Sequence, residues 1–169
     1  GITSNYTGTG RYLWQKPEMV LNLFGDLTQK TEVDIGAGEG FFTFRLAEKA
    51  QKVVAIDISE EAIAYLEKST PTELKSKVET RLVSPSSPNL KTEEADAVLL
   101  VNTYMYLDNR IEYLQKVNQG MPSNGKILIN DFKKKRTALG PDANIRVPLY
   151  KVEQELVQAG FRILHTDDT

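Results

Sequence analysis

Three glycines in alternate positions are the strongest chemical signal in this sequence. Gly36, Gly38 and Gly40 follow an apolar run that ends at Ile35. Glycine belongs where the backbone takes a positive φ or lies against a ligand, and the start of a following helix offers free amides to an anionic group. A tight turn without a ligand is the alternative interpretation. We expect a site for a nucleotide-like molecule at this turn.

The spacing of these glycines differs from the fingerprint of dinucleotide-binding proteins. That fingerprint has glycine at its first, third and sixth positions, whereas the sixth position counted from Gly36 is Phe41. A phenylalanine at this position would crowd a pyrophosphate against the helix. The spacing therefore disfavours an NAD-linked oxidoreductase.

Two aspartates lie beside predicted strand ends. Asp57 closes the next apolar run, 21 positions after Gly36, and Asp34 precedes the glycines. A carboxylate at the end of the second strand can accept hydrogen bonds from both hydroxyls of a ribose, because these are two donors a short distance apart. Open α/β sheets bind ligands at the carboxyl ends of their strands. We favour this role over that of two ordinary surface acids.

Six short apolar runs predict the strands that position these residues, because the runs are too short for buried helices. They are Glu32–Ile35, Val53–Ile58, Val78–Val83, Ala97–Val101, Lys126–Asn130 and Phe161–His165. Strands that are apolar on both faces and alternate with helical patterns indicate a parallel sheet. The expected fold class is α/β, a three-layer Rossmann-like fold with helices on both faces of a mostly parallel sheet.

Apolar residues at helical spacing predict four helices and a weaker one at about Lys16–Leu23. Ser59 and Asp108 are expected to cap two of these helices, because their side-chain oxygens can accept hydrogen bonds from free backbone amides. The last helix is predicted at Leu149–Ala159, and Gly160 ends it.

The composition excludes several classes of function. Twenty-one basic and twenty-three acidic residues give a net charge of −2, so the overall charge does not favour nucleic acid or an anionic membrane as a partner, and only a local patch could. There is no cysteine and one histidine, His165, so we expect no metal site. No apolar run approaches the ~20 residues that cross a bilayer. We expect one folded, cytoplasmic domain, although a start at Gly1 leaves a processed leader open.

Several segments, in this order, resemble class I S-adenosylmethionine-dependent methyltransferases, in particular the small bacterial enzymes of type 11 or of ubiquinone biosynthesis. The segments are VDIGAGEGFF, VVAIDIS, EEADAVLLVNTYMYL, GKILINDFK and a helix that ends in AGF. Together they cover about residues 30–166. The resemblance implies a cofactor-binding core over residues 30–169, preceded by a segment with a cover helix over residues 1–29.

The resemblance implies S-adenosylmethionine as the cofactor and S-adenosylhomocysteine as the product. The glycine turn would line the methionine end, one acid would hold its ammonium group through water, and a second acid would take the ribose. An apolar side chain would lie against the adenine, and the backbone after the fourth strand would pass below the cofactor. In that order these residues are Gly36, Ala37, Gly38 and Gly40; Asp34; Asp57; Ile58; and Asn102.

Two features depart from the family pattern. The family often has an acidic residue after its third strand that hydrogen bonds the adenine amine, whereas this chain has Ser84 in a loop with two prolines. We expect Ser84 to be a weaker substitute. The family sheet also has a seventh, antiparallel strand between its fifth and sixth, and we expect this strand to be missing because the sequence stops at Thr169.

Methyl transfer from a sulfonium is an in-line displacement with a neutral leaving group, so alignment of the acceptor can carry much of the chemistry. Candidate acceptor contacts are Tyr104 and Asp131, which follow the fourth and fifth predicted strands. The Tyr104 phenol can bond an acceptor oxygen while its ring walls the pocket. The alternatives are core or rim packing for Tyr104, and a loop cap or a contact with Lys133 for Asp131.

We therefore expect a methyltransferase that acts on a small molecule. The first alternative is a protein that binds S-adenosylmethionine or S-adenosylhomocysteine without catalysis, because the sequence offers no evident general base. The second is the NAD-linked oxidoreductase, for which the distance from the glycines to Asp57 is suitable. The identity of the acceptor and the oligomeric state stay open.

Overall fold

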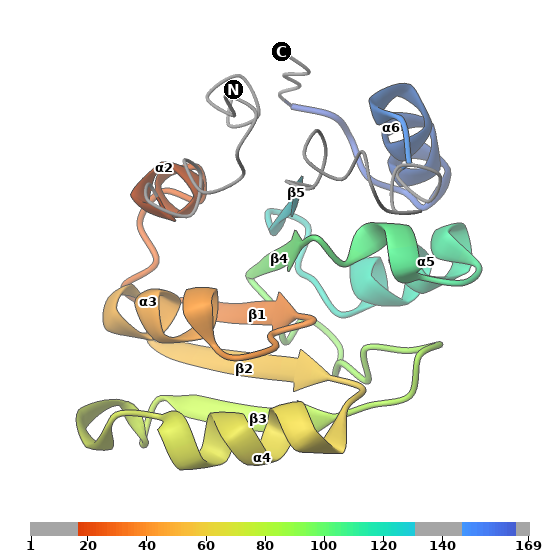
Figure 1. The fold of residues 1–169 in the computed structure, drawn as a ribbon. Helices are drawn as coiled ribbons and strands as arrows, with labels where there is room; N and C mark the ends of the chain where they lie inside the picture. Colours follow the sequence, from red (N-terminus) through yellow and green to blue (C-terminus); the bar gives the residue numbers. More distant parts are fainter. Residues whose placement is uncertain (1–16, 131–146, 165–169) are drawn as a thin grey trace.

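The computed structural model describes residues 17–130 and 147–164. Five parallel strands form one sheet in the order β3-β2-β1-β4-β5, with helices on both faces (Figure 1). The strands are β1 Thr31–Ile35, β2 Lys52–Asp57, β3 Val78–Leu82, β4 Ala97–Val101 and β5 Lys126–Asn130. The predicted three-layer α/β fold is confirmed.

Burial on both faces explains why the central strands are apolar runs rather than alternating patterns. Strands β1, β2 and β4 are buried along almost their whole length, whereas the outer strands β3 and β5 are mostly half-buried. A strand covered on both sides needs apolar residues at consecutive positions. Successive side chains of β2 still point to opposite faces of the sheet. Val53 and Ala55 face one layer of helices, while Val54 and Ile56 face the other.

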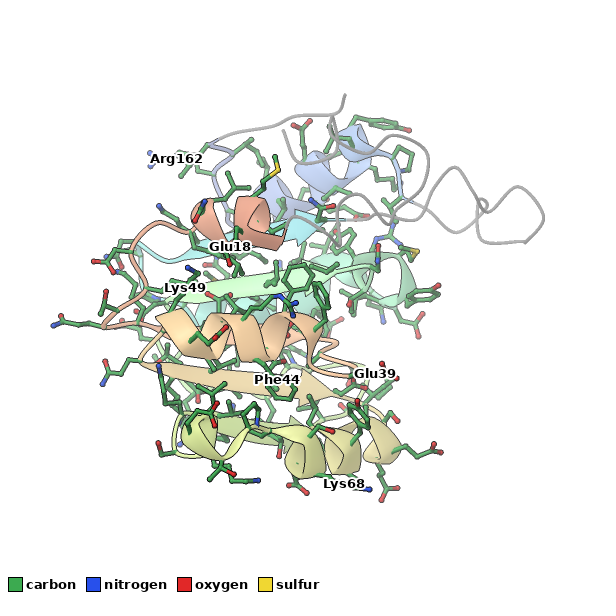
Figure 2. The ribbon with its side chains drawn as sticks, turned by 60° about the vertical axis from the view of Figure 1, so that its left-hand side comes forward. Glu18, Glu39, Phe44, Lys49, Lys68 and Arg162 are labelled. Carbon is green, nitrogen blue, oxygen red and sulfur yellow. The ribbon has the colours of Figure 1, made fainter. Side chains whose placement is uncertain are left out.

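The helices divide between the two faces of the sheet. One face is covered by α2 Pro17–Asn22, α3 Phe41–Lys49 and α4 Glu60–Ser69, and the other by α5 Arg110–Gln119 and α6 Leu149–Gln158. Figure 2 shows Glu18 of α2 and Lys49 of α3 on this first face, where they form an exposed ion pair of 3.2 Å. Among the described residues, no helix is long and apolar enough to span a membrane.

The two predicted helix caps have different outcomes. Ser59 caps α4 as expected, because its hydroxyl accepts a hydrogen bond from the Ala62 amide at 3.2 Å. The prediction for Asp108 is wrong, since α5 begins one residue later with Asn109 as its N-cap and without a side-chain cap. Asn109 takes the left-handed conformation, with φ 48°, which asparagine tolerates better than most residues. The resulting turn places Arg110 at the first helical position.

The sixth predicted strand is wrong over the part that the structure describes. Residues Phe161–Leu164 form no strand, and His165 lies outside the described residues. The Phe161 amide donates to the Leu156 carbonyl and so closes the end of α6 after Gly160. A strand requires a hydrogen-bonded neighbour, and an apolar sequence pattern cannot reveal whether that neighbour is present.

Glu32 is an acidic side chain in the core between β1 and its covering helices. It is fully buried, and within the described residues both of its carboxylate oxygens lack a hydrogen-bond partner. Burial raises the pKa of Glu32 well above its usual value, and the negative charges of Asp34 and Asp96 raise it further. The folded protein therefore holds Glu32 in its protonated form at a pH where the unfolded chain has released the proton.

The substitution Glu32→Met is expected to stabilise the fold, and more so at higher pH. A raised pKa in the folded state contributes stability below the usual pKa of 4.5, and this contribution is lost as the pH rises through the folded-state pKa. At pH 7 we expect the free energy of unfolding to increase by about 2 kcal/mol, because an unpartnered polar group is removed from the core. Urea unfolding at pH 5 and pH 8 measures both effects.

The matched control for Glu32 is Glu48→Met, because Glu48 is exposed on α3. Its substitution should leave the difference in unfolding free energy between pH 5 and pH 8 unchanged. A Glu32→Met protein with the same pH dependence as the parent would contradict the protonated state assigned to Glu32.

Candidate functional site: a cradle at the carboxyl ends of the strands

The turn between β1 and α3 has a backbone that only glycine adopts easily. Gly36, Gly38 and Gly40 have φ values of 76°, 58° and 87°. The amides of Gly36 and Ala37 both donate to the carbonyl of Ile56, at 2.8 and 3.0 Å. The turn is therefore fixed to the end of β2, which is the strand that carries Asp57.

The three glycines face different surroundings. A Cβ on Gly36 would lie 2.3 Å from the Thr103 hydroxyl, and a Cβ on Gly40 would lie 2.6 Å from the ring of Phe44. Figure 2 shows Phe44 between α3 and the neighbouring elements. A Cβ on Gly38 would meet no atom closer than 4.0 Å. A Cβ on Gly36 or on Gly40 would thus overlap a side chain of the protein itself, while Gly38 faces open space in which a ligand could lie against the backbone.

The Asp57 carboxylate is turned toward this glycine turn. One carboxylate oxygen accepts from the Gly38 amide at 2.9 Å, and the other accepts from the Ser59 amide at 3.0 Å. Each carboxylate oxygen has two lone pairs. Asp57 therefore keeps acceptor capacity on both oxygens beside the open face of Gly38, which is what recognition of two adjacent hydroxyls requires.

Asp34 lies beneath the turn, almost fully buried on the α3 side of β1. The Thr43 hydroxyl of α3 donates to its carboxylate at 2.8 Å. Burial raises the pKa of Asp34 to about 6, the Thr43 hydrogen bond opposes that rise, and the negative charge of Asp57 adds to it. This position is suited to an electrostatic effect on a cationic group in the cradle, while direct contact is limited by burial.

A hollow of about 460 Å³ continues from the ends of β2 and β3. Its lining residues are Ile58, Glu60, Leu82, Val83, Ser84, Ser87 and Asn89. Ile58 and Leu82 are 59% and 49% exposed and lie at or just after the ends of two adjacent strands, so they form an apolar surface on one side of the hollow. Ile58 and Ser84, which the sequence singled out, lie together here. An apolar wall with polar groups at its rim fits a flat heterocycle.

A family model described as a methyltransferase domain matches residues 33–129. These residues contain the glycine turn, Asp57 and the hollow. The chain belongs to this methyltransferase family. The cofactor of the class I members is S-adenosylmethionine, and S-adenosylhomocysteine is the product. A comparison with curated protein sequences gives no match.

Solved structures of similar proteins support this assignment. A SAM-dependent methyltransferase from Aquifex aeolicus is 28% identical, with a TM-score of 0.75, over 88% of this chain and 81% of that one. A putative type 11 methyltransferase from Sulfolobus solfataricus is 25% identical, with a TM-score of 0.68, over 83% and 79%. Phosphoethanolamine N-methyltransferase 1 from Haemonchus contortus is 27% identical, with a TM-score of 0.62, over 75% of this chain and 28% of that one.

The side chains of this methyltransferase fit its cofactor. The open face of Gly38 and the carboxylate of Asp57 leave room and acceptors for a ribose, and the wall formed by Ile58 and Leu82 suits a purine. In the described part of the chain, no group of three acidic or histidine side chains is placed to hold a metal ion.

The segment after β4 packs against the same turn from below. Asn102 has a φ of 55°, and its amide donates to the carbonyl of Asn130 at the end of β5, at 2.8 Å. The Thr103 hydroxyl donates to the carbonyls of Ile35 and Val101, at 3.3 and 3.0 Å. Asn102 therefore lies at the strand ends, as the sequence predicts, while Thr103 was missed. Thr103 supports the turn through its contact with Gly36, and no local sequence pattern predicts this contact.

Tyr104 of the methyltransferase begins the short helix η3 Tyr104–Tyr106 and is buried, 3% exposed. Its hydroxyl donates to the Glu155 carboxylate at 2.6 Å, and Arg110 donates to both oxygens of that carboxylate at 2.8 and 2.9 Å. Burial raises the pKa of the Tyr104 phenol, and the contact with Glu155 raises it further. The neighbouring Tyr106 is 58% exposed. The other predicted acceptor contact, Asp131, lies outside the described residues.

The substitution Glu155→Ala is expected to lower the free energy of unfolding by about 2 kcal/mol, because the half-buried Arg110 and the buried Tyr104 hydroxyl would each lose their partner. Glu155→Gln should restore roughly half of this loss, since its amide oxygen still accepts one hydrogen bond. Urea unfolding measures both values. Gln158→Ala, at an exposed position of the same helix, serves as the control. Equal stabilities for Glu155→Ala and this control would show that the hydrogen bonds of Glu155 with Tyr104 and Arg110 do not hold α6 on α5.

Proposed function

We propose that this protein transfers a methyl group from S-adenosylmethionine to a small-molecule acceptor by in-line displacement. The observation that carries the proposal is the shared position of Gly38 and Asp57. The open backbone of Gly38 and the carboxylate of Asp57 face the same space, and the hollow lined by Ile58 continues from it. A nucleoside that carries an amino-acid tail matches this succession of groups.

In this proposal the residues of the cradle orient the cofactor. The Asp57 carboxylate binds the two ribose hydroxyls, and Ile58 and Ser84 hold the adenine, one by apolar contact and the other at its polar edge. Gly36, Ala37, Gly38 and Gly40 form the floor under the methionine end. Asp34 attracts the ammonium group through water. The backbone of Asn102 lies below the cofactor.

S-adenosylmethionine supplies an electrophilic methyl group, so the protein has to align an acceptor and exclude water. Holding the two reactants in line can lower the barrier by roughly 7–11 kcal/mol. We assign the acceptor side to Tyr104 and Asp131. The Tyr104 hydroxyl donates to Glu155, which leaves the phenol oxygen able to accept a hydrogen bond from an acceptor N–H or O–H group. As a buried side chain, Tyr104 would act from the wall of the acceptor pocket.

Two observations support a small molecule as the acceptor. The net charge of −2 gives no attraction to nucleic acid. The Haemonchus contortus relative is an N-methyltransferase solved with phosphoethanolamine and S-adenosylhomocysteine. An NAD-linked reaction ranks below this proposal, because Phe41 occupies the position of the third fingerprint glycine and its ring contacts the Arg45 guanidinium at 3.9 Å.

The experiment has two stages. Isothermal titration calorimetry with S-adenosylhomocysteine tests the cofactor site, and transfer of a labelled methyl group to a panel of amines, phenols and carboxylic acids tests catalysis. Binding together with transfer supports the proposal. Binding without transfer to any member of the panel favours the alternative of a binding protein without activity. A folded protein that does not bind S-adenosylhomocysteine contradicts both.

A further inference from the structure

Asn130 has a side-chain oxygen that is buried without a partner. Within the described residues, the buried side-chain atoms that lack a hydrogen bond belong to Glu32 and Asn130. Glu32 lies at the second position of β1, inside the core. Asn130 is the last residue of β5 and is 6% exposed, and it is its Oδ1 atom that has no partner there. A buried amide oxygen without a partner costs stability, so its place at the ligand-binding edge of the sheet indicates a functional role.

The order of the strands places Asn130 beyond the methionine end of the proposed cofactor. The sheet runs β3-β2-β1-β4-β5. In the proposed function the adenine lies at the ends of β3 and β2, the ribose at the end of β2 and the methionine end at β1. The ends of β4 and β5 are what this edge leaves for the acceptor. Neighbouring strands are about 4.8 Å apart, so the end of β5 lies about 10 Å from the end of β1.

The backbone of Asn130 is joined to the glycine turn through two contacts. The Asn102 amide donates to the Asn130 carbonyl at 2.8 Å. The next residue, Thr103, donates to the Ile35 carbonyl at 3.3 Å and lies directly beside Gly36. The end of β5 therefore has a fixed position relative to the turn. The carbonyl of Asn130 is used in this link, while its Oδ1 atom takes no part in it.

The Asn130 side chain lies on the same face of the sheet as Asp34. The register aligns Asp34 with Leu99, and Leu99 with Leu128. Successive side chains of a strand alternate between the two faces, so Asn130, two positions after Leu128, returns to that face. The proposed function places Asp34 near the ammonium group of the cofactor. Asn130 therefore offers an acceptor oxygen on the same face, two strands further along the edge.

We propose that the Oδ1 atom of Asn130 accepts a hydrogen bond from the atom that is methylated, and so selects substrates whose nitrogen or oxygen carries a hydrogen. This inference rests on the proposed function, because it requires methyl transfer at this edge of the sheet. In the transfer, the carbon–sulfur bond breaks, the bond from the methyl carbon to the nitrogen or oxygen forms, and the positive charge passes from sulfur to that atom. Its proton leaves to water after the transfer.

The charge that develops on the methylated atom explains why Oδ1 would act on the rate. An N–H or O–H group becomes a stronger donor as its atom becomes positive, so the hydrogen bond to Asn130 is stronger in the transition state than in the bound substrate. An interaction of this kind raises kcat. A tertiary amine leaves Oδ1 without a partner, and a carboxylate places its own lone pairs against it.

Transfer of a labelled methyl group tests this role of Asn130. The probes are the amines, phenols and carboxylic acids of the panel, together with the N,N-dimethyl derivative of each amine. We expect the wild-type protein to prefer primary amines or phenols to carboxylic acids and tertiary amines. Asn130→Leu should abolish this preference and lower kcat for the preferred probe by about 10- to 100-fold, with a smaller change in KM, because a hydrogen bond to a charged group is lost. Asn130→Asp, which keeps an acceptor oxygen, should recover most of the loss.

Two further measurements separate a lost contact from a damaged fold. Calorimetry with S-adenosylhomocysteine should give Asn130→Leu the same affinity as the wild-type protein. Its urea unfolding midpoint should rise, because leucine removes an unpartnered polar group from the interior. The matched control is Asn124→Leu, the same substitution at an exposed position just before β5. This control should leave kcat and the preference among the probes unchanged.

The outcomes separate this inference from the proposed function. If the wild-type protein does not bind S-adenosylhomocysteine, or methylates none of the probes, both fail. If it methylates some of them and Asn130→Leu keeps both kcat and the preference, only the role of Asn130 is overturned. The same holds if carboxylic acids or tertiary amines are the preferred probes. A lower unfolding midpoint together with weaker cofactor binding in Asn130→Leu would assign Asn130 a structural role and would overturn the inference as well.

Discussion

Asp57→Ala is expected to weaken the binding of S-adenosylhomocysteine by about 100-fold, because two hydrogen bonds to a charged acceptor are lost and each contributes about 1.5 kcal/mol. The same substitution removes the acceptor for the Gly38 amide and so loosens the turn that faces the ligand. Calorimetry measures the affinity. Circular dichroism checks that the variant is folded.

Asp57→Asn and Glu61→Gln complete this experiment. The asparagine keeps one acceptor oxygen and should recover part of the affinity, since the remaining hydrogen bond is no longer assisted by charge. Glu61 lies in the first turn of α4, exposed to solvent, so its substitution should have no effect. Wild-type affinity in Asp57→Ala would contradict the proposed contact between Asp57 and the ribose.

Gly36→Ala and Gly38→Ala are expected to fail in opposite ways. The added methyl group of Gly36→Ala would overlap the Thr103 hydroxyl at a φ of 76°, and we expect the free energy of unfolding to fall by about 3 kcal/mol. Gly38→Ala places its methyl group in open space, so only the left-handed backbone opposes it, at about 1 kcal/mol. Urea unfolding measures both effects.

The effects on the binding of S-adenosylhomocysteine should have the opposite order, so that Gly38→Ala, the more stable of the two variants, binds more weakly. Gly38→Ala should bind about tenfold or more weakly, because its methyl group lies where the ligand approaches the backbone. The double variant Gly36→Ala/Thr103→Ala should regain part of the stability lost by Gly36→Ala, because the overlapping atoms are gone. Equal stability of the two single variants would contradict the contact between Gly36 and Thr103.

The elements that depend on local chemistry could be predicted from the sequence. The apolar runs predict β1, β2 and β4 because both faces of these strands are buried. Ser59 predicts its own cap because the acceptor and the amide lie three residues apart. Asp108 failed because two polar residues in succession can start a helix, and the left-handed Asn109 decides the choice.

The parts of the site that depend on contacts between distant segments could not be predicted. Thr103 is significant because it lies against Gly36, which is 67 positions earlier in the chain. The sequence indicates Tyr104 as a possible acceptor contact, but it does not reveal that the Tyr104 hydroxyl donates to Glu155 of α6, 51 positions later. The position of Leu82 in the hollow depends on the parallel pairing of β3 with β2, because this pairing puts Leu82 opposite Asp57. A register of this kind becomes known only with the sheet.

The double hydrogen bond to the Ile56 carbonyl has a consequence for how a ligand is received. The amides of Gly36 and Ala37 bind β2, the amide of Gly38 binds Asp57, and the amide of Gly40 closes onto the Ala37 carbonyl. The glycine turn is therefore preorganised, so little conformational entropy is lost when a ligand binds to it. The conformation of this turn depends on two strands, because the acceptors of three of its amides lie on β2. A peptide that spans only β1 to α3 would contain Gly36, Gly38 and Gly40 and would still lack the β2 acceptors that hold the turn in shape.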